Sequence, residues 1–190
     1  MTSSRRRTVF VCAFLLVGAA GAAAYYHSLV PATHPDHDHG ILNLDGGGKL
    51  LAEARDGKSR NFVGRPEKVL AIHFATPEAP EAAAEQRALF EFQRHLPPNA
   101  GVEIVTLVKA PDWKALDAWL AANQLTPPSP GSVLLDREGE TTQKLNSKRP
   151  LETMFFNAEG KLSSQGRGRL EWGADAAEHV EKARSGATLE

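Results

Sequence analysis

Two groups of side chains in this sequence have residue types and spacings that could support chemistry. The first is a short tract in which His34, His37 and His39 are interspersed with Asp36 and Asp38. Neutral imidazoles are common ligands of Zn(II), Cu(II) and Ni(II), and aspartate oxygens can complete such a site. A polar spacer whose histidines bind nothing specific has the same composition. The tract therefore predicts either a metal carrier with an open copper or zinc site, or a simple tether.

The second group is a pair of carboxylates, Glu78 and Glu81, three residues apart at the start of a predicted helix. On a helix they would share one face with Glu85, and paired carboxylates can bind a metal or share a proton. His73, in the strand before them, could be their partner. However, acids in a first helical turn are favoured by the helix dipole, and a histidine in an apolar strand is often buried and hydrogen-bonded. We expect these structural roles, and therefore no catalytic residue.

A single cysteine, Cys12, limits the redox chemistry of the chain. No disulfide can form within the chain, and a mechanism that needs two thiols on one chain is excluded. The formal net charge is -1, and the only tight basic run is residues 5–7. Because nucleic-acid binding leaves a basic footprint, we expect no nucleic-acid partner.

The N-terminal segment has the features of an export signal. Three arginines precede residues 8–26, a stretch of 19 residues without a charged side chain that is rich in alanine and glycine towards its end. A signal peptide cleaved before Tyr25 fits this pattern. An uncleaved membrane anchor fits it as well, since a helix of this length covers roughly 28 Å, close to the ~30 Å hydrocarbon core of a bilayer. By the positive-inside rule, both alternatives place the rest of the chain outside the cytoplasm, in the periplasm.

Composition divides the chain into four parts. Residues 1–26 form the signal peptide or anchor, and residues 27–45 form a flexible linker that carries the histidine tract and lacks hydrophobic periodicity. Residues 46–186 form one domain, and residues 187–190 form a C-terminal tail. One core is expected because a chain of 190 residues is short for two full-sized domains.

The domain alternates predicted strands and helices and then ends in a hairpin and a helix. Buried strands are short apolar runs rich in β-branched residues, and helices show apolar residues at spacings of three and four. These patterns predict strands at 69–74, 102–108, 132–135, 154–156 and 161–164, and helices at 76–96, 112–120 and 174–184, with one or two helical turns in 138–146. The order predicts an α/β protein with a thioredoxin-like three-layer fold, in which helices cover both faces of a mixed central sheet.

Several motifs resemble those of the extracytoplasmic thioredoxin-like proteins of bacteria, the TlpA and ResA group. In that family a strand is followed by F/W-A-T-W-C-x-x-C and then by a helix, and Phe74-Ala75-Thr76 matches the first three positions. Residues 133–145 and 155–162 resemble the second half of the family. Residues 168–172 resemble its Gly-x-Leu-x-Trp lead into the last helix. The likeness spans roughly residues 62–183.

The redox motif of the family is absent from its expected place. Glu78 and Glu81 stand where the two cysteines would be, and Pro77 replaces the tryptophan before them. Thioredoxin-type exchange needs a thiolate nucleophile and a second thiol that resolves the mixed disulfide, and a carboxylate can do neither. The resemblance therefore implies a degenerate member that lacks the C-x-x-C motif.

Two further features depart from the family pattern. Ile72 occupies the position of the buried acid that often relays protons in thioredoxins, so that acid is expected to be absent. The family also has a cis-proline before its hairpin strand, and alignment places Leu151 there, with Pro150 one residue earlier. Either Pro150 serves as the cis-proline through a bulge, or the feature is lost.

The resemblance implies a protein- or peptide-binding module rather than an enzyme. Binding at the substrate surface of the family needs no thiol, and the corresponding residues here are Thr76, Pro77 and Arg149. The expected partner is a protein or peptide of the cell envelope, and the membrane is contacted through the N-terminal segment. Two alternatives stay open: a copper or zinc carrier that uses the histidine tract, and a component of a thiol–disulfide pathway whose thiols come from another chain.

Overall fold

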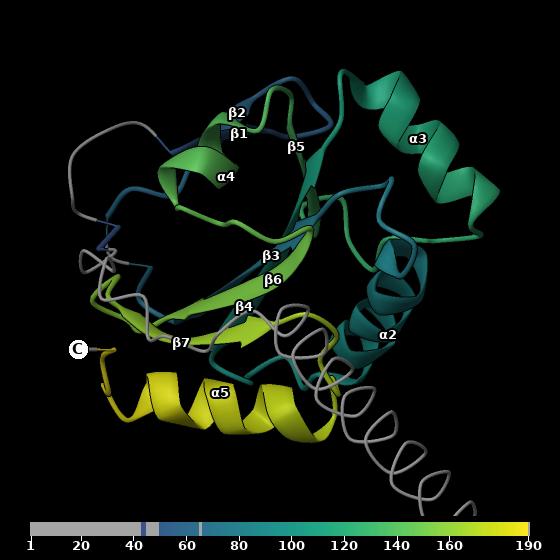
Figure 1. The fold of residues 1–190 in the computed structure, drawn as a ribbon. Coiled ribbons are helices and arrows are strands. Elements are labelled where there is room, and N and C mark those ends of the chain that lie inside the picture. Colours follow the sequence, from purple (N-terminus) through teal and green to yellow (C-terminus); the bar gives the residue numbers. More distant parts are fainter. Residues whose placement is uncertain (1–42, 45–49, 65, 190) are drawn as a thin grey trace, which may run out of the picture. The chain divides into compact units, whose positions relative to one another are not determined.

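Seven strands form one mixed sheet in the part of the chain that the computed structural model describes, residues 43–44, 50–64 and 66–189 (Figure 1). Their order across the sheet is β2-β1-β5-β4-β3-β6-β7. The strands are β1 (Leu51–Glu53), β2 (Ser59–Asn61), β3 (Val69–Ala75), β4 (Val102–Lys109), β5 (Val133–Asp136), β6 (Leu151–Phe156) and β7 (Leu162–Arg167). The helices are α2 (Ala82–His95), α3 (Trp113–Ala122), α4 (Glu140–Lys144) and α5 (Ala174–Arg184). None of these helices is long and apolar enough to cross a membrane, and the predicted segment 8–26 lies outside the described residues.

Three parallel strands build the centre of the sheet. β3 has the sequence VLAIHFA, and every residue in it is buried because strands flank it on both sides and helices cover it. β4 pairs in parallel with the whole of β3, and β5 pairs in parallel with the second half of β4. β6 runs antiparallel to β3 on its other side. The predicted mixed sheet is therefore confirmed.

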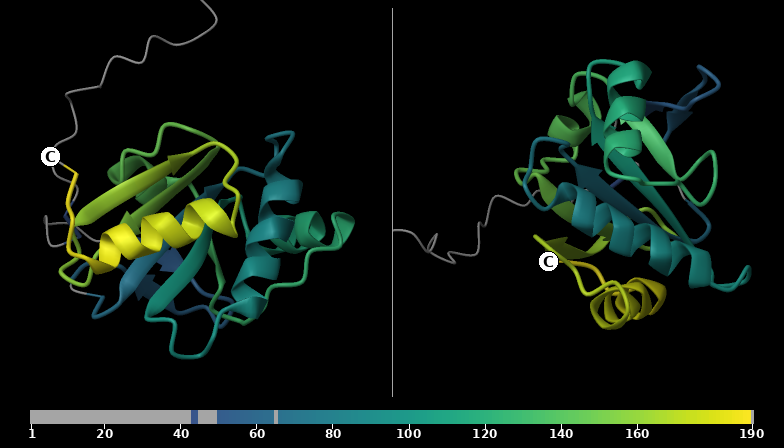
Figure 2. Two further views of the ribbon diagram at one scale, coloured as in Figure 1. Left: turned by 90° about the horizontal axis from the view of Figure 1, so that it is seen from below. Right: turned by 90° about the vertical axis from the view of Figure 1, so that its right-hand side faces the viewer.

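Helices lie on both faces of the sheet, as the sequence predicts. Apolar side chains of α2, α3 and α5 pack on the face that carries Ala71, Val108 and Phe155. Figure 2 shows α2 and α5 lying against this face. α4 lies on the opposite side (Figure 1), and Leu145, directly after α4, packs there with Ile72. The result is the three-layer arrangement expected of a thioredoxin-like fold.

α2 starts later than predicted. The sequence predicts a helix from residue 76, whereas the helix begins at Ala82 with Glu81 in the N-cap position. A turn precedes it, closed by the Ala79 N–H, which donates to the Thr76 carbonyl at 2.9 Å. Pro80 explains the late start, because the residue before a proline disfavours helical geometry and the proline nitrogen cannot donate. The two candidate glutamates therefore lie in this turn and at the helix start, and they do not share a helical face.

The sequence patterns do not predict two parts of the domain, the β1–β2 hairpin and residues 43–44. Leu44, assigned to the linker from composition, is 1 % exposed and packs in the core. Its N–H donates to the Gly160 carbonyl at 2.8 Å. Gly160 has a φ of +78°, and a Cβ there would lie 2.6 Å from the Gly64 carbonyl oxygen, so this close approach requires glycine. The packed domain thus includes chain before residue 46.

The segment after α5 returns to the sheet. The Leu189 N–H donates to the Leu162 carbonyl at 3.1 Å. Leu162 begins β7, which is an edge strand. Leu189, in the segment predicted as a tail, therefore contacts the edge of the sheet.

Candidate binding site

Backbone hydrogen bonds bring three segments together at one end of the sheet. The Thr76 N–H, directly after β3, donates to the Pro150 carbonyl at 3.2 Å. The Gly168 N–H, directly after β7, donates to the Leu151 carbonyl at 2.9 Å. We call the resulting surface the front edge; it consists of residues 76–81, 147–150 and 167–169. The first two segments carry Thr76, Pro77 and Arg149, the residues that the resemblance places on one binding surface, and the third is an addition from the structure.

Glu78 and Glu81 are exposed at the front edge. Neither carboxylate forms an ion pair with any described residue. Neither caps α2, whose N-terminus receives no side-chain hydrogen bond. Both side chains face solvent, and within the described residues no group is hydrogen-bonded to either carboxylate in a way that would orient it for proton transfer.

Four cationic side chains lie in the other two segments of the front edge: Lys148, Arg149, Arg167 and Arg169, all of them exposed. Within the described part of the chain none of the four forms an ion pair, and Arg167 donates only a long hydrogen bond of 3.5 Å to Gln165. The front edge thus carries four unpaired cations and two unpaired carboxylates. Such a surface favours a partner that brings anionic groups.

Pro150 is not a cis-proline, because no peptide bond between described residues is cis. Its carbonyl accepts the hydrogen bond from Thr76 that joins the first two segments of the front edge. Leu151, at 6 % exposed, already belongs to β6. The only irregularity in the pairing of β6 with β7 falls at the far end of β6. Of the two alternatives for this position, the structure therefore supports loss of the family feature.

His73 is fully buried in β3, two residues before its end. Its Nδ1 lies 2.9 Å from Thr153 Oγ1, and its ring meets the Trp172 ring edge-on, with 5.7 Å between centroids. Burial lowers the pKa of His73 to about 3, so the imidazole is neutral at physiological pH. The structural role expected for this histidine is confirmed.

Glu85 is a buried acid, whereas the sequence places it only on a shared helix face with Glu78 and Glu81. The side chain is 0 % exposed, and its Oε1 accepts two hydrogen bonds, from Trp172 Nε1–H at 2.7 Å and from the Leu170 N–H at 3.1 Å. Burial raises the pKa of the Glu85 carboxyl, and these two donors and the charge of Arg169 oppose the rise. Glu85 therefore ties α2 to the segment that leads into α5.

Helical spacing is the signal that could have revealed Glu85. It lies three residues after Ala82 and four before Leu89, and both are buried on the inner face of α2. Its neighbour Gln86 is buried as well, and Gln86 Nε2 donates to Thr106 Oγ1 at 3.0 Å. Trp172 is a second signal, since a buried indole N–H needs an acceptor.

The described residues contain no cluster of three His, Cys, Asp or Glu side chains that could hold a metal ion. Glu78 and Glu81 therefore lack a third ligand within this part of the chain. His34, His37 and His39 lie outside the described residues, so the copper or zinc site of the histidine tract stays a prediction.

Comparison with known proteins rests on solved structures, since no protein-family model and no curated protein matches the sequence. StoA from Bacillus subtilis is 18% identical with a TM-score of 0.55, over 70% of this chain and 95% of that chain. The exposed lipoprotein thioredoxin Etrx1 from Streptococcus pneumoniae is 18% identical with a TM-score of 0.55, over 70% and 99%. A secreted Mycobacterium tuberculosis disulfide oxidoreductase, homologous to Escherichia coli DsbE, is 18% identical with a TM-score of 0.52, over 71% and 94%. Together with the sheet order and the helical layers, these likenesses show that the chain has a thioredoxin-like fold.

Proposed function

We propose that this chain is an exported binding protein that holds an extended segment of a partner protein at its front edge. The observation that supports this most directly is the hydrogen bond between the Thr76 N–H and the Pro150 carbonyl, which joins the turn after β3 to the loop before β6. The family that the sequence resembles holds extended peptides against the corresponding loop by backbone hydrogen bonds. That mode of recognition tolerates many sequences and requires no thiol.

Thiol chemistry has no place in the proposal. Glu78 and Glu81 occupy the positions where the resemblance expects cysteines, and the only cysteine of the chain, Cys12, precedes the domain. A carboxylate cannot form or resolve a mixed disulfide. The similar proteins that are described as oxidoreductases would therefore share a surface with this chain, and not a reaction.

The charges of the front edge indicate which partner segment fits. Lys148, Arg149, Arg167 and Arg169 form no ion pair with a described residue, so an acidic segment would complement them. Glu78 would repel acids that lie directly over the turn. We therefore propose a segment whose acidic residues lie over the loops 147–150 and 167–169.

We also propose that the domain acts outside the cytoplasm. The basic and apolar pattern of the N-terminal segment supports this location. So does the fold, since one similar protein is described as secreted and another as an exposed lipoprotein.

Hydrogen exchange tests the proposed surface. The full-length chain is used to capture a partner from an envelope extract by cross-linking, and amide exchange of the captured complex is compared with that of the free chain. We expect slower exchange in residues 76–81 and 147–150. Protection confined to segments outside the front edge would contradict the proposal.

A further inference from the structure

β4 and β5 differ in length, and this difference leaves a gap in the sheet. β4 has 8 residues, whereas β5 has 4 and pairs with β4 only from Thr106 onwards. The first residues of β4 pair with β3 on one side and have no strand of the described chain on the other. We call this gap the β4 slot.

Backbone geometry determines which groups point into the β4 slot. The N–H and C=O of one residue point to the same side of a strand, and the side alternates along the chain. The Thr106 N–H donates to the Ser132 carbonyl, on the side of β5, so the backbone groups of Val102 and Ile104 point to that side as well. The Ile104 carbonyl accepts a hydrogen bond from Gln93 Nε2 at 2.9 Å. The described residues supply no partner for the N–H groups of Val102 and Ile104 or for the Val102 carbonyl.

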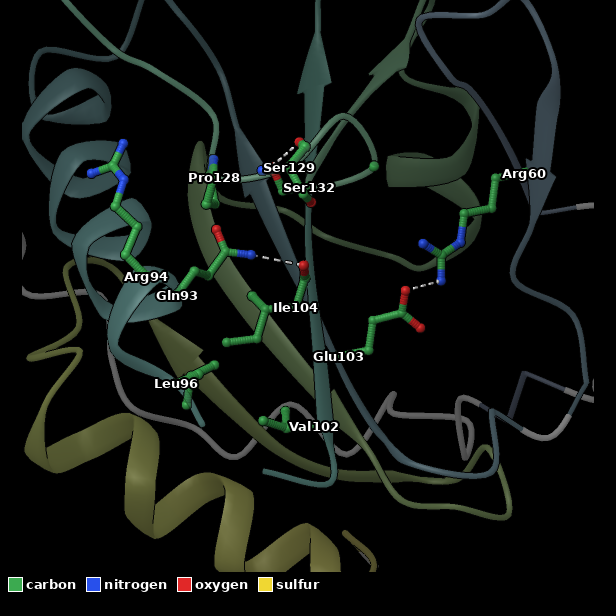
Figure 3. A pocket seen from close by; sticks show the side chains of 11 residues that line it. Arg60, Gln93, Arg94, Leu96, Val102, Glu103, Ile104, Pro128, Ser129 and Ser132 are labelled. Atoms are coloured by element: carbon green, nitrogen blue, oxygen red, sulfur yellow. Dashed lines mark hydrogen bonds and ion pairs between the residues drawn. The ribbon is translucent and has the colours of Figure 1, made fainter. Parts of the chain in front are cut away.

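A cavity of about 570 Å³ lies at the β4 slot (Figure 3). One wall is the end of α2, with Gln93 and Leu96. The other wall carries Glu103, which forms an ion pair of 2.8 Å with Arg60. The loop before β5, residues 128–132, closes one end. Gln93 Oε1 is buried and has no hydrogen-bond partner within the described chain.

We propose that the β4 slot binds an extended polypeptide segment that lies along the start of β4, in line with β5. Another polypeptide backbone presents donors and acceptors at the two-residue repeat of roughly 6.6 Å that separates Val102 from Ile104. A carbonyl of the segment would accept from the Ile104 N–H, and an N–H of the segment would donate to the Val102 carbonyl. These backbone hydrogen bonds would add the segment to the sheet as a strand, and strand addition is a recognised way to bind peptides.

This site is distinct from the front edge and does not depend on the function proposed there. The front edge lies at the carboxyl end of β3, whereas the β4 slot lies at the amino end of β4 and the carboxyl end of α2. Loss of one surface would leave the other in place.

The two walls of the slot indicate the side chains of the segment. Successive side chains of a strand point to opposite faces. Leu96 and Ile104 make one face apolar, while the Arg60 and Glu103 pair makes the other polar (Figure 3). A segment that alternates apolar and acidic residues fits, with an acid that shares the Arg60 guanidinium with Glu103, because a guanidinium has five N–H donors.

The probe that tests the site is a blocked tetrapeptide, acetyl-Val-Asp-Val-Asp-amide, titrated into the isotope-labelled full-length chain and followed by NMR. We expect a saturable shift of the Ile104 amide signal and slower exchange of its hydrogen. A second peptide has the same side chains but N-methylated backbone nitrogens. Because it cannot donate backbone hydrogen bonds, we expect it to bind about tenfold more weakly.

Two glycine variants provide the matched controls. Gly131 lines the cavity, and a Cβ there meets no atom within 4 Å, so Gly131→Leu adds a bulky side chain at the cavity without a clash at its Cβ. Gly173 is equally open but lies at the start of α5, so Gly173→Leu is the control. We expect only Gly131→Leu to weaken binding, by about tenfold or more. The proposal is overturned if the Ile104 signal does not shift, if the N-methylated peptide binds equally well, or if both variants bind like the parent chain.

Discussion

Glu81 and Glu85 are the same residue type one helical turn apart, and their surroundings differ completely. Glu81 is exposed at the front edge, forms no ion pair with a described residue and does not cap its helix. Glu85 is buried and accepts hydrogen bonds from Leu170 and Trp172. The first carboxylate is available to a partner, whereas the second is part of the packing between α2 and the segment before α5.

This difference separates binding from stability. Changing a solvated charge alters the free energy of unfolding little. Removing a buried acceptor leaves its donors without a partner, and this lowers the free energy of unfolding far more. Substitutions at the front edge should therefore change partner affinity, and substitutions of the buried Glu85 should change stability.

Glu85→Ala should produce the largest change in stability. We expect the free energy of unfolding to fall by about 3 kcal/mol, because two buried N–H groups lose their acceptor and a cavity opens. Glu85→Gln keeps a carbonyl oxygen in place and should lose about 1 kcal/mol. Glu81→Ala, the exposed control, should stay within about 0.5 kcal/mol of the parent chain. Urea unfolding measures all three; equal losses at both positions would remove the distinction between them.

His73 should make stability depend on pH. Its pKa is about 3 in the folded chain and 6.5 in its ordinary state, so below pH 6.5 the unfolded chain binds a proton that the folded chain does not. The contribution is thus present above pH 6.5 and is lost as the pH falls towards 3. His73→Phe should reduce the loss of unfolding free energy between pH 6.5 and 4.5 by about 2 kcal/mol.

His95→Phe is the control for this measurement, because His95 is exposed on α2. It should leave the pH dependence of unfolding close to that of the parent chain. If His73→Phe and His95→Phe gave the same pH dependence, the buried histidine would not be the group that resists protonation.

Charge reversal at the front edge should change affinity and not stability. We expect Lys148→Glu with Arg149→Glu to weaken binding of an acidic partner segment about tenfold, or ~1.4 kcal/mol. Lys114→Glu with Lys182→Glu changes the net charge equally at exposed sites on α3 and α5. Fluorescence anisotropy in low and moderate salt compares the two pairs. An equal loss of affinity in both would assign the effect to net charge and not to the front edge.

The last prediction is that the chain does not accelerate disulfide reduction. Glu78 and Glu81 provide no thiolate, so insulin reduction by dithiothreitol should proceed at the rate of the reductant alone. A clear acceleration by the purified chain would show that the front edge supports catalysis as well as binding.

Most strands and helices can be predicted from local sequence patterns, because residues close together in sequence specify them. The strand predicted at 69–74 is β3, the one predicted at 102–108 is β4, and the helix predicted at 174–184 is α5. β1 and β2 have 3 residues each, too few to show periodicity. The predicted start of α2 at residue 76 is wrong because Pro80 disfavours helical geometry in the residue before it.

The candidate site likewise has one part that local sequence patterns predict and another part that they do not. Residues 76–81 and 147–150 could be predicted as neighbours because they flank adjacent strands of the expected sheet. The contribution of Arg167 and Arg169 depends on the register of β6 with β7, which a hydrophobic pattern does not specify in detail. Glu85 meets Trp172 across 87 positions of sequence, a tertiary contact that no local signal encodes.

The hydrogen bond from Leu189 to Leu162 bears on self-association. An uncovered edge strand is a template on which other copies of a chain can add, which leads to swapped dimers and fibrils. β7 is an edge strand of 6 residues, and the segment after α5 occupies one of its acceptors. β2, at the opposite edge, has only 3 residues. The sheet thus ends in a strand of 3 residues at one margin and in a partly occupied strand at the other, and both features lower its capacity to add strands from other copies of the chain.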